Sequence, residues 1–139
     1  MQSNDSYISF VLRYGGFSGG AHGYELKKSY AYDLKNAKVI ELADLFNGNQ
    51  NYLNKISTET RAILKEKILK DLNEQDLMDD EKERNEYING ILELVDEGTK
   101  EEGNNFSVFT FTPDKIKIYF AQYQVGPYSM GAPEVEISR

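Results

Sequence analysis

A glycine-dense stretch that contains the only histidine of the chain is the first candidate for chemistry. Its residues, 15–23, read Gly-Gly-Phe-Ser-Gly-Gly-Ala-His-Gly. It does not fit a phosphate-binding loop, because no Gly-Lys-Ser/Thr follows and the next element is predicted to be a strand, which lacks the free amide groups of a helix N-terminus. We favour a structural interpretation, in which the glycines provide positive φ angles or close backbone approach at a bend, over a loop that binds a ligand.

His22 has few partners in the sequence for a reaction. The chain has one histidine and no cysteine, too few side chains of these types for a typical structural zinc site. A general base needs a nucleophile and an orienting carboxylate, and the nearby Ser18 lacks the strand-turn-helix setting of a nucleophile elbow. We therefore expect no catalytic residues, no metal and no cofactor, and we expect His22 to hydrogen-bond to backbone and hold the loop.

An acidic run between residues 71 and 86 raises the possibility of a calcium site. An EF-hand loop requires a glycine at its sixth position, and a loop that starts at Asp71 has Asp76 there. A solvated linker between two helices is the favoured interpretation.

Tyrosines in the two predicted strand regions are a third candidate, since they can stack on sugar rings or anchor a protein interface. Because tyrosine is also favoured in strands, we expect most to be structural and one or two to be exposed and functional. The candidates are Tyr24, Tyr30, Tyr32, Tyr119, Tyr123 and Tyr128.

The net charge of −7 argues against a nucleic-acid partner and against docking on anionic lipid, while it permits a cationic partner. The first residues lack the apolar core of a signal peptide, and no apolar run approaches the roughly 20 residues of a membrane helix. We expect a cytosolic protein, or a mature or excised piece of an exported one.

Periodicity divides the chain into strands, then helices, then strands. Alternation and β-branched or aromatic content predict strands at residues 7–14, 24–34, 39–42, 106–112, 115–120 and 135–137. Helical spacing predicts one helix that Asn51 or Ser57 caps and that runs to Leu72, and a second that Asp79 or Asp80 caps and that ends at Gly98 or Gly103.

This order predicts a single α+β domain over residues 1–139, with an antiparallel sheet and two helices inserted between the strand regions and packed on one face. Of the 10 Tyr and 7 Phe residues, fourteen fall within residues 7–34 and 106–128. We therefore expect both regions to share one aromatic-rich sheet, joined by the bend at His22 and the corner at Pro127. Our expectation of a non-enzymatic protein depends on this shared sheet. Residues 1–6 are expected to be a disordered or artificial start.

Two segments together resemble a known family. The first runs from Gly19-Gly20-Ala21-His22-Gly23 through Tyr30-Ala31-Tyr32-Asp33-Leu34 to Ile40-Glu41-Leu42-Ala43-Asp44-Leu45-Phe46, and the second is Phe120-Ala121-Gln122-Tyr123-Gln124-Val125-Gly126-Pro127-Tyr128-Ser129-Met130-Gly131. Over about residues 7–137 the chain resembles a bacterial extracytoplasmic domain of unknown function. That domain occurs in a lysozyme-sensing anti-sigma factor, beside the catalytic domain of a peptidoglycan deacetylase, and in envelope lipoproteins.

The resemblance implies an extracytoplasmic domain, in the periplasm or at the cell surface, that binds or senses a lysozyme-like protein or a peptidoglycan-related polymer. Tyr123 and Tyr128 flank the Gly-Pro turn and are expected to pack against the glycine loop. The candidate binding residues are Gly20, His22, Gly23, Tyr123, Pro127 and Tyr128. Two alternatives remain: a hydrolase that acts on wall material through His22, and a scaffold domain without a ligand.

Overall fold

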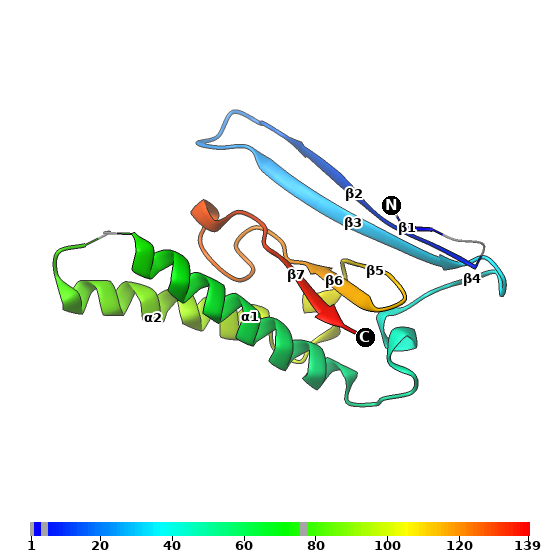
Figure 1. Cartoon of the computed structure of the whole chain (residues 1–139). Helices are drawn as coiled ribbons and strands as arrows, with labels where there is room; N and C mark the ends of the chain where they lie inside the picture. The colour runs from blue at the N-terminus through cyan, green and yellow to red at the C-terminus, as the bar shows by residue number, and fades with distance from the viewer. Residues whose placement is uncertain (1, 4–5, 76–77) are drawn as a thin grey trace.

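The chain forms an α+β fold in three layers in a computed structural model that describes residues 2–3, 6–75 and 78–139 (Figure 1). A long strand hairpin forms the first layer, a small sheet the second and a pair of helices the third. Among the described residues, neither helix combines the length and the apolar character that crossing a bilayer requires.

The first layer is an antiparallel sheet in the order β1-β2-β3-β4. Its central ribbon pairs β2 (Tyr7–Gly16) with β3 (Tyr24–Asp33) over ten residues. β1 (Gln2–Ser3) pairs with Ile8 and Ser9, where we had expected a disordered start, and Met1, Asn4 and Asp5 lie outside the described residues. β4 (Lys38–Val39) completes the sheet.

The turn between β3 and β4 lies between the predicted strands at residues 24–34 and 39–42. The carboxylate of Asp33 accepts bonds from the side chain of Asn36 and from the backbone amides of Lys35 and Asn36, at 2.8–3.0 Å. The side-chain bond from Asn36 is the largest cause that holds the pKa of Asp33 below its ordinary value.

The helices are α1 (Tyr52–Glu74) and α2 (Glu81–Gly98), close to the predicted positions. The carboxylate of Asp80 caps α2 by accepting the amide of Glu83 at 2.9 Å, whereas the side chain of Asn51 makes no capping bond to α1. Asp76, at the position that decided against an EF-hand loop, lies outside the described residues.

The second sheet, in the order β5-β6-β7, consists of β5 (Phe109–Phe111), β6 (Lys115–Tyr119) and β7 (Glu134–Ser138). The helices pack on one face of this sheet, as predicted, and the main core lies between them. Three short 3₁₀ helices connect the elements: η1 (Leu42–Phe46), η2 (Gly103–Phe106) and η3 (Tyr128–Met130). Phe106 is fully buried in η2, not in the strand that its aromatic neighbours predicted. The core residues include Ile56, Leu64, Ile91, Val95, Phe106, Ile116, Ile118, Phe120, Val135 and Ile137.

The expectation of one shared sheet is wrong, because the two strand regions form separate sheets that meet along β5. The backbone amides of Phe109 and Phe111 on β5 donate to the hydroxyls of Ser29 and Ser9, at 2.9 and 3.1 Å. Side chains of the hairpin thus occupy donors that a continuous sheet would pair with another backbone. The expectation of a non-enzymatic protein loses this support and must be argued from the candidate site alone.

The hairpin turns its mostly polar face toward the second sheet. The even-numbered residues of β2 share one face, and that face points to solvent, with Leu12 50% and Tyr14 54% exposed. On β3 the outward residues include Leu26, Tyr30 and Tyr32, which are also exposed. Alternation in the sequence assigned these residues to one face correctly and gave no information on which side the core would lie.

Candidate binding site

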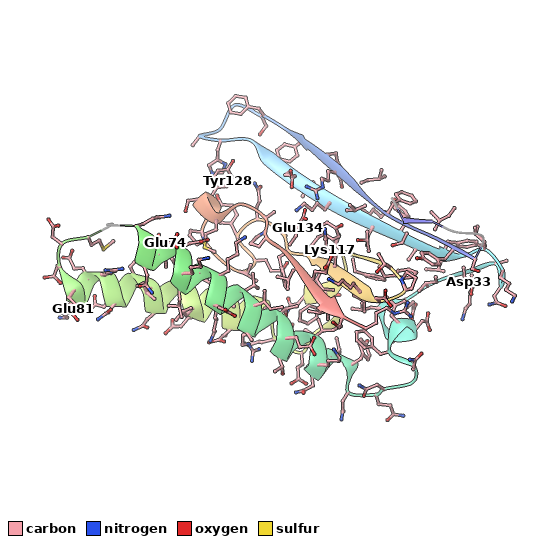
Figure 2. All side chains as sticks on the ribbon, in the orientation of Figure 1. Asp33, Glu74, Glu81, Lys117, Tyr128 and Glu134 are labelled. Carbon is pink, nitrogen blue, oxygen red and sulfur yellow. The ribbon has the colours of Figure 1, made fainter. Side chains whose placement is uncertain are left out.

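The two segments that carry the family resemblance meet at the tip of the hairpin. The first contributes the tip loop between β2 and β3, and the second contributes the turn before η3 together with η3 itself. Figure 2 shows Tyr128 between η3 and the tip of the hairpin. The site is therefore a contact between the first layer and the rest of the molecule, the second sheet with its connecting segments and the helices, which we call the body.

Three aromatic side chains make this contact, and we call them the aromatic clasp: His22, Tyr123 and Tyr128. The rings of His22 and Tyr128 stack with their centroids 3.8 Å apart and their planes 16° from parallel. The hydroxyl of Tyr123 lies 3.0 Å from Nε2 of His22, and that of Tyr128 donates to the carbonyl of Gly23 at 3.2 Å. The predicted packing of both tyrosines against the glycine loop is confirmed.

Both ring nitrogens of His22 face polar groups. Nδ1 lies 3.2 Å from the carbonyl oxygen of Gly23, which can only accept, so Nδ1 is the donor in this contact. Nε2 lies 3.0 Å from the hydroxyl of Tyr123. Both nitrogens therefore have partners within the clasp, in agreement with the expectation that His22 bonds to backbone and holds the loop.

Tyr123 has an unusual backbone conformation. Its φ is 67°, in the left-handed region, which is rare for a bulky side chain. The side chain of Gln124 fixes the turn: its Oε1 accepts the amide of Ala121 at 3.0 Å, and its Nε2 donates to the carbonyls of Gly98 and Asn105 at 3.0 and 2.9 Å. With the turn fixed, Tyr123 remains 55% exposed.

Gln124 and Gly98 are supporting residues that sequence reasoning missed. Gly98 ends α2 directly against the turn, and a Cβ atom there would overlap the carbonyl oxygen of Gln124 and lie 2.8 Å from Cγ1 of Val125. The sequence offered a weak signal, since Gly98 was predicted only as a helix end. A glycine at a helix end gives no indication of a close approach by another segment.

A second set of bonds fixes the hairpin beside the clasp. The side-chain carbonyl of Gln122 accepts the backbone amide of Glu25 at 3.2 Å. Nζ of Lys27 donates to the carbonyl of Ala132 at 3.2 Å, and the side chain of Lys27 is only 6% exposed. The clasp therefore lies on a hairpin that is bound to the body at several points.

The remaining predicted site residues are placed as follows. Pro127 directly precedes η3 with φ −69°, and its carbonyl accepts the amide of Met130 at 3.0 Å. Gly23 contributes its carbonyl to the clasp, and a Cβ there would lie 3.0 Å from the carbonyl oxygen of Gly16. Gly20 is exposed, with no atom within 4 Å of its Cβ position, and the structure does not bring it into the clasp. The tip-loop glycine with a positive φ, 89°, is Gly19.

Exposure of the six candidate tyrosines differs from the prediction of one or two. Tyr24, Tyr30, Tyr32 and Tyr123 are exposed, Tyr128 is half-buried, and Tyr119 is buried with its hydroxyl 2.9 Å from that of Thr110. Three of the exposed four lie on the outward face of β3. In the part of the chain that the structure describes, no three His, Cys, Asp or Glu side chains gather closely enough to hold a metal ion.

The fold and the clasp define an α+β domain whose two motif segments join at the surface. Residues 43–139 match the family described as "Protein of unknown function (DUF3298)", and the chain belongs to this family. The predicted resemblance is therefore confirmed. The matched residues include Tyr123, Pro127 and Tyr128 but not the glycine loop.

A curated relative matches nearly the whole chain. Peptidoglycan-N-acetylmuramic acid deacetylase PdaC of Bacillus subtilis (strain 168) is 29% identical to it over 132 residues, 95% of this chain and 24% of that protein. The chain thus spans about a quarter of the length of the curated relative, and the similarity extends to the hairpin.

Proposed function

We propose that the chain is a non-enzymatic binding domain of the bacterial cell envelope, exposed in the periplasm or at the cell surface. Its aromatic clasp contacts the ligand, which is a lysozyme-like protein or a peptidoglycan-related polymer. The similarity to a relative named as a peptidoglycan deacetylase supports a role connected with the cell wall. The acidic net charge of −7 is compatible with a cationic protein ligand such as lysozyme.

The observation that carries the proposal is the surface position of the clasp. His22 and Tyr123, 101 residues apart in sequence, meet through a hydrogen bond while Tyr123 stays more than half exposed. A left-handed backbone at a tyrosine costs free energy, and such residues cluster at functional sites. An exposed, fixed aromatic ring suits stacking on a sugar or anchoring of a protein surface.

A binding role is favoured over a hydrolase by the chemistry of His22. To act as a general base toward water or a substrate, the ring must offer a free nitrogen, and Nε2 lies 3.0 Å from the Tyr123 hydroxyl while Nδ1 faces the Gly23 carbonyl. Among the described residues, the hydrogen-bond partners of the clasp include no carboxylate that could orient His22 as in a catalytic triad.

The proposal is tested by calorimetric titration of the protein with hen lysozyme and, separately, with soluble peptidoglycan fragments. We expect binding to one of these ligands and a loss of at least tenfold in affinity in Tyr123→Ala, because that variant removes the exposed ring. Tyr87→Ala is the matched control, since Tyr87 is a partly exposed tyrosine on α2 and is not one of the three clasp residues. It should bind like the unmodified protein.

The other outcomes contradict the proposal in different ways. Release of products from the peptidoglycan fragments, abolished in His22→Ala, would establish the hydrolase alternative. If neither ligand gives a heat of binding and no product is released, the remaining interpretation is a scaffold domain without a ligand. Equal loss of affinity in Tyr123→Ala and Tyr87→Ala would place the ligand away from the clasp.

A further inference from the structure

The edge of β3 away from β2 lacks a neighbouring strand over most of its length. β4 pairs only with Tyr32 and Asp33, so residues 24–31 of this ten-residue strand have no neighbouring strand on that side. An open edge offers a row of backbone donors and acceptors to another chain.

The hydrogen bonds of β3 establish which backbone groups point to this edge. The amide of Glu25 donates outward to the side chain of Gln122, and the carbonyl of Ala31 accepts outward from the amide of Ile40 at 2.9 Å. Because alternate residues of an antiparallel strand point their amide and carbonyl to the same side, Lys27 and Ser29 also point theirs outward. In the described part of the chain, these backbone groups of Lys27 and Ser29 have no hydrogen-bond partner.

An apolar pocket lies beside this edge. It has a volume of about 530 Å³ and is bounded by Ser29–Ala31 of β3, by β4 and the residues after it, by the start of α1 and by η2. Its lining residues include Tyr52, Leu53, Phe106 and Phe109. A pocket of this size can receive an apolar side chain.

We propose that the open edge of β3 binds an extended peptide segment of another polypeptide, which adds to the sheet as a strand and places an apolar side chain in this pocket. A polypeptide backbone carries donors and acceptors that repeat every two residues, about 6.8 Å, which matches the spacing of Lys27 and Ser29. A sugar polymer lacks that repeat. Strand addition gives affinity through the backbone and specificity through side-chain pockets. The site is distinct from the clasp and does not depend on its function.

The corresponding edge of β2 is less suited to a peptide. The hollow beside it has a volume of about 240 Å³ and contains Lys115, Lys117 and Glu136 among its lining residues. An apolar side chain placed there would displace water from these charged groups at a free-energy cost. The structure therefore favours the edge of β3.

The test uses a library of phage-displayed linear dodecapeptides, selected on the whole protein, followed by titration of a selected synthetic peptide. We expect peptides with apolar residues at alternate positions. Lys27→Pro and Lys27→Ala form the matched pair, because both remove the lysine side chain and only proline removes the outward amide. Since that amide is not used in the β2–β3 pairing, proline is tolerated there.

Binding should be at least tenfold weaker in Lys27→Pro than in Lys27→Ala. Val39→Glu, at an exposed residue on the rim of the pocket, should weaken binding as a second and independent variant. In the unmodified protein, hydrogen exchange of the Lys27 and Ser29 amides should slow when the peptide binds.

Three outcomes would overturn the inference. The first is that the selection yields no binding peptide. The second is equal affinity of the peptide for Lys27→Pro, Lys27→Ala and Val39→Glu. The third is loss of peptide binding in Tyr123→Ala, which would move the peptide to the clasp and away from the β3 edge.

Discussion

At the scale of single residues, the clasp depends on two positions that do not touch a ligand in our proposal. Gln124 fixes the turn that presents Tyr123, and Gly98 leaves room for that turn against the end of α2. Packing of the turn on the end of α2 therefore determines the conformation of Tyr123, and with it the geometry of the clasp.

Gly98→Ala should destabilise the protein by about 1–3 kcal/mol, because its Cβ overlaps the Gln124 carbonyl and the turn must shift. The φ of Gly98 is not positive, so the expected cost is steric and not conformational. Gly90→Ala in the same helix is the control: its Cβ meets no atom within 4 Å, and it should stabilise by about 0.5–1 kcal/mol. Urea denaturation measures both, and equal effects would show that the close approach at Gly98 is unimportant.

The sequence predicted part of the clasp and missed its supports. The expectation that Tyr123 and Tyr128 pack against the glycine loop is drawn together with the family resemblance, in which the two segments occur in the same domain. The bond from Gln124 to Gly98 spans 26 residues, and nothing in the local pattern indicates which carbonyl a glutamine side chain will reach.

At the scale of elements, the strands and helices lie close to their predicted positions because periodicity is a local property. Phe106 is an exception: its aromatic neighbours favour a strand, and η2 buries it instead. The sequence did not predict which face of the hairpin points to solvent, because the alternation from Ile8 to Tyr14 is equally consistent with an outward or an inward apolar face.

The hairpin is fixed to β5 by serine hydroxyls, and this makes Ser9→Ala a sharp test. Ser9 is fully buried, and its loss leaves the amide of Phe111 without its acceptor, which should cost about 1–3 kcal/mol. Ser18→Ala in the exposed tip loop should change stability by less than about 0.5 kcal/mol. Denaturation and hydrogen exchange of the Phe111 amide measure the effect, and similar values for both variants would contradict this role of Ser9.

At the scale of the whole molecule, charged groups join the hairpin to the second sheet. Glu134 on β7 forms ion pairs with Arg13 on β2, with Lys27 on β3 at 3.8 Å and with Lys117 on β6 at 4.0 Å. Figure 2 shows Glu134 and Lys117 close together on the second sheet below the hairpin. One carboxylate thus compensates cations from both sheets.

Glu134→Gln should weaken the attachment of the hairpin by about 1–3 kcal/mol, because it leaves the nearly buried Lys27 with less compensating charge. Glu97→Gln removes an exposed pair with Lys100 and should cost less than about 0.5 kcal/mol. Faster hydrogen exchange in β2 and β3, with unchanged exchange in the helix–sheet core, would identify the affected layer. The idea fails if both variants behave alike.

The division into two sheets could not be predicted from the sequence. Both strand regions have the aromatic content of a common core, but the pairing of strands about eighty or more residues apart is decided by tertiary contacts such as those of Ser9 and Ser29. The predicted class and the position of the helices needed only local patterns, and they are confirmed.

The polar inner face of the hairpin has a consequence for temperature. Separation of the hairpin from β5 exposes hydroxyl, charged and backbone groups together with the contact between the Tyr7 and Phe111 rings, so we expect a smaller heat-capacity change than for opening the apolar helix–sheet core. Cooling should therefore weaken the core more than the hairpin attachment. The stability of the hairpin attachment and that of the helix–sheet core should therefore depend differently on temperature.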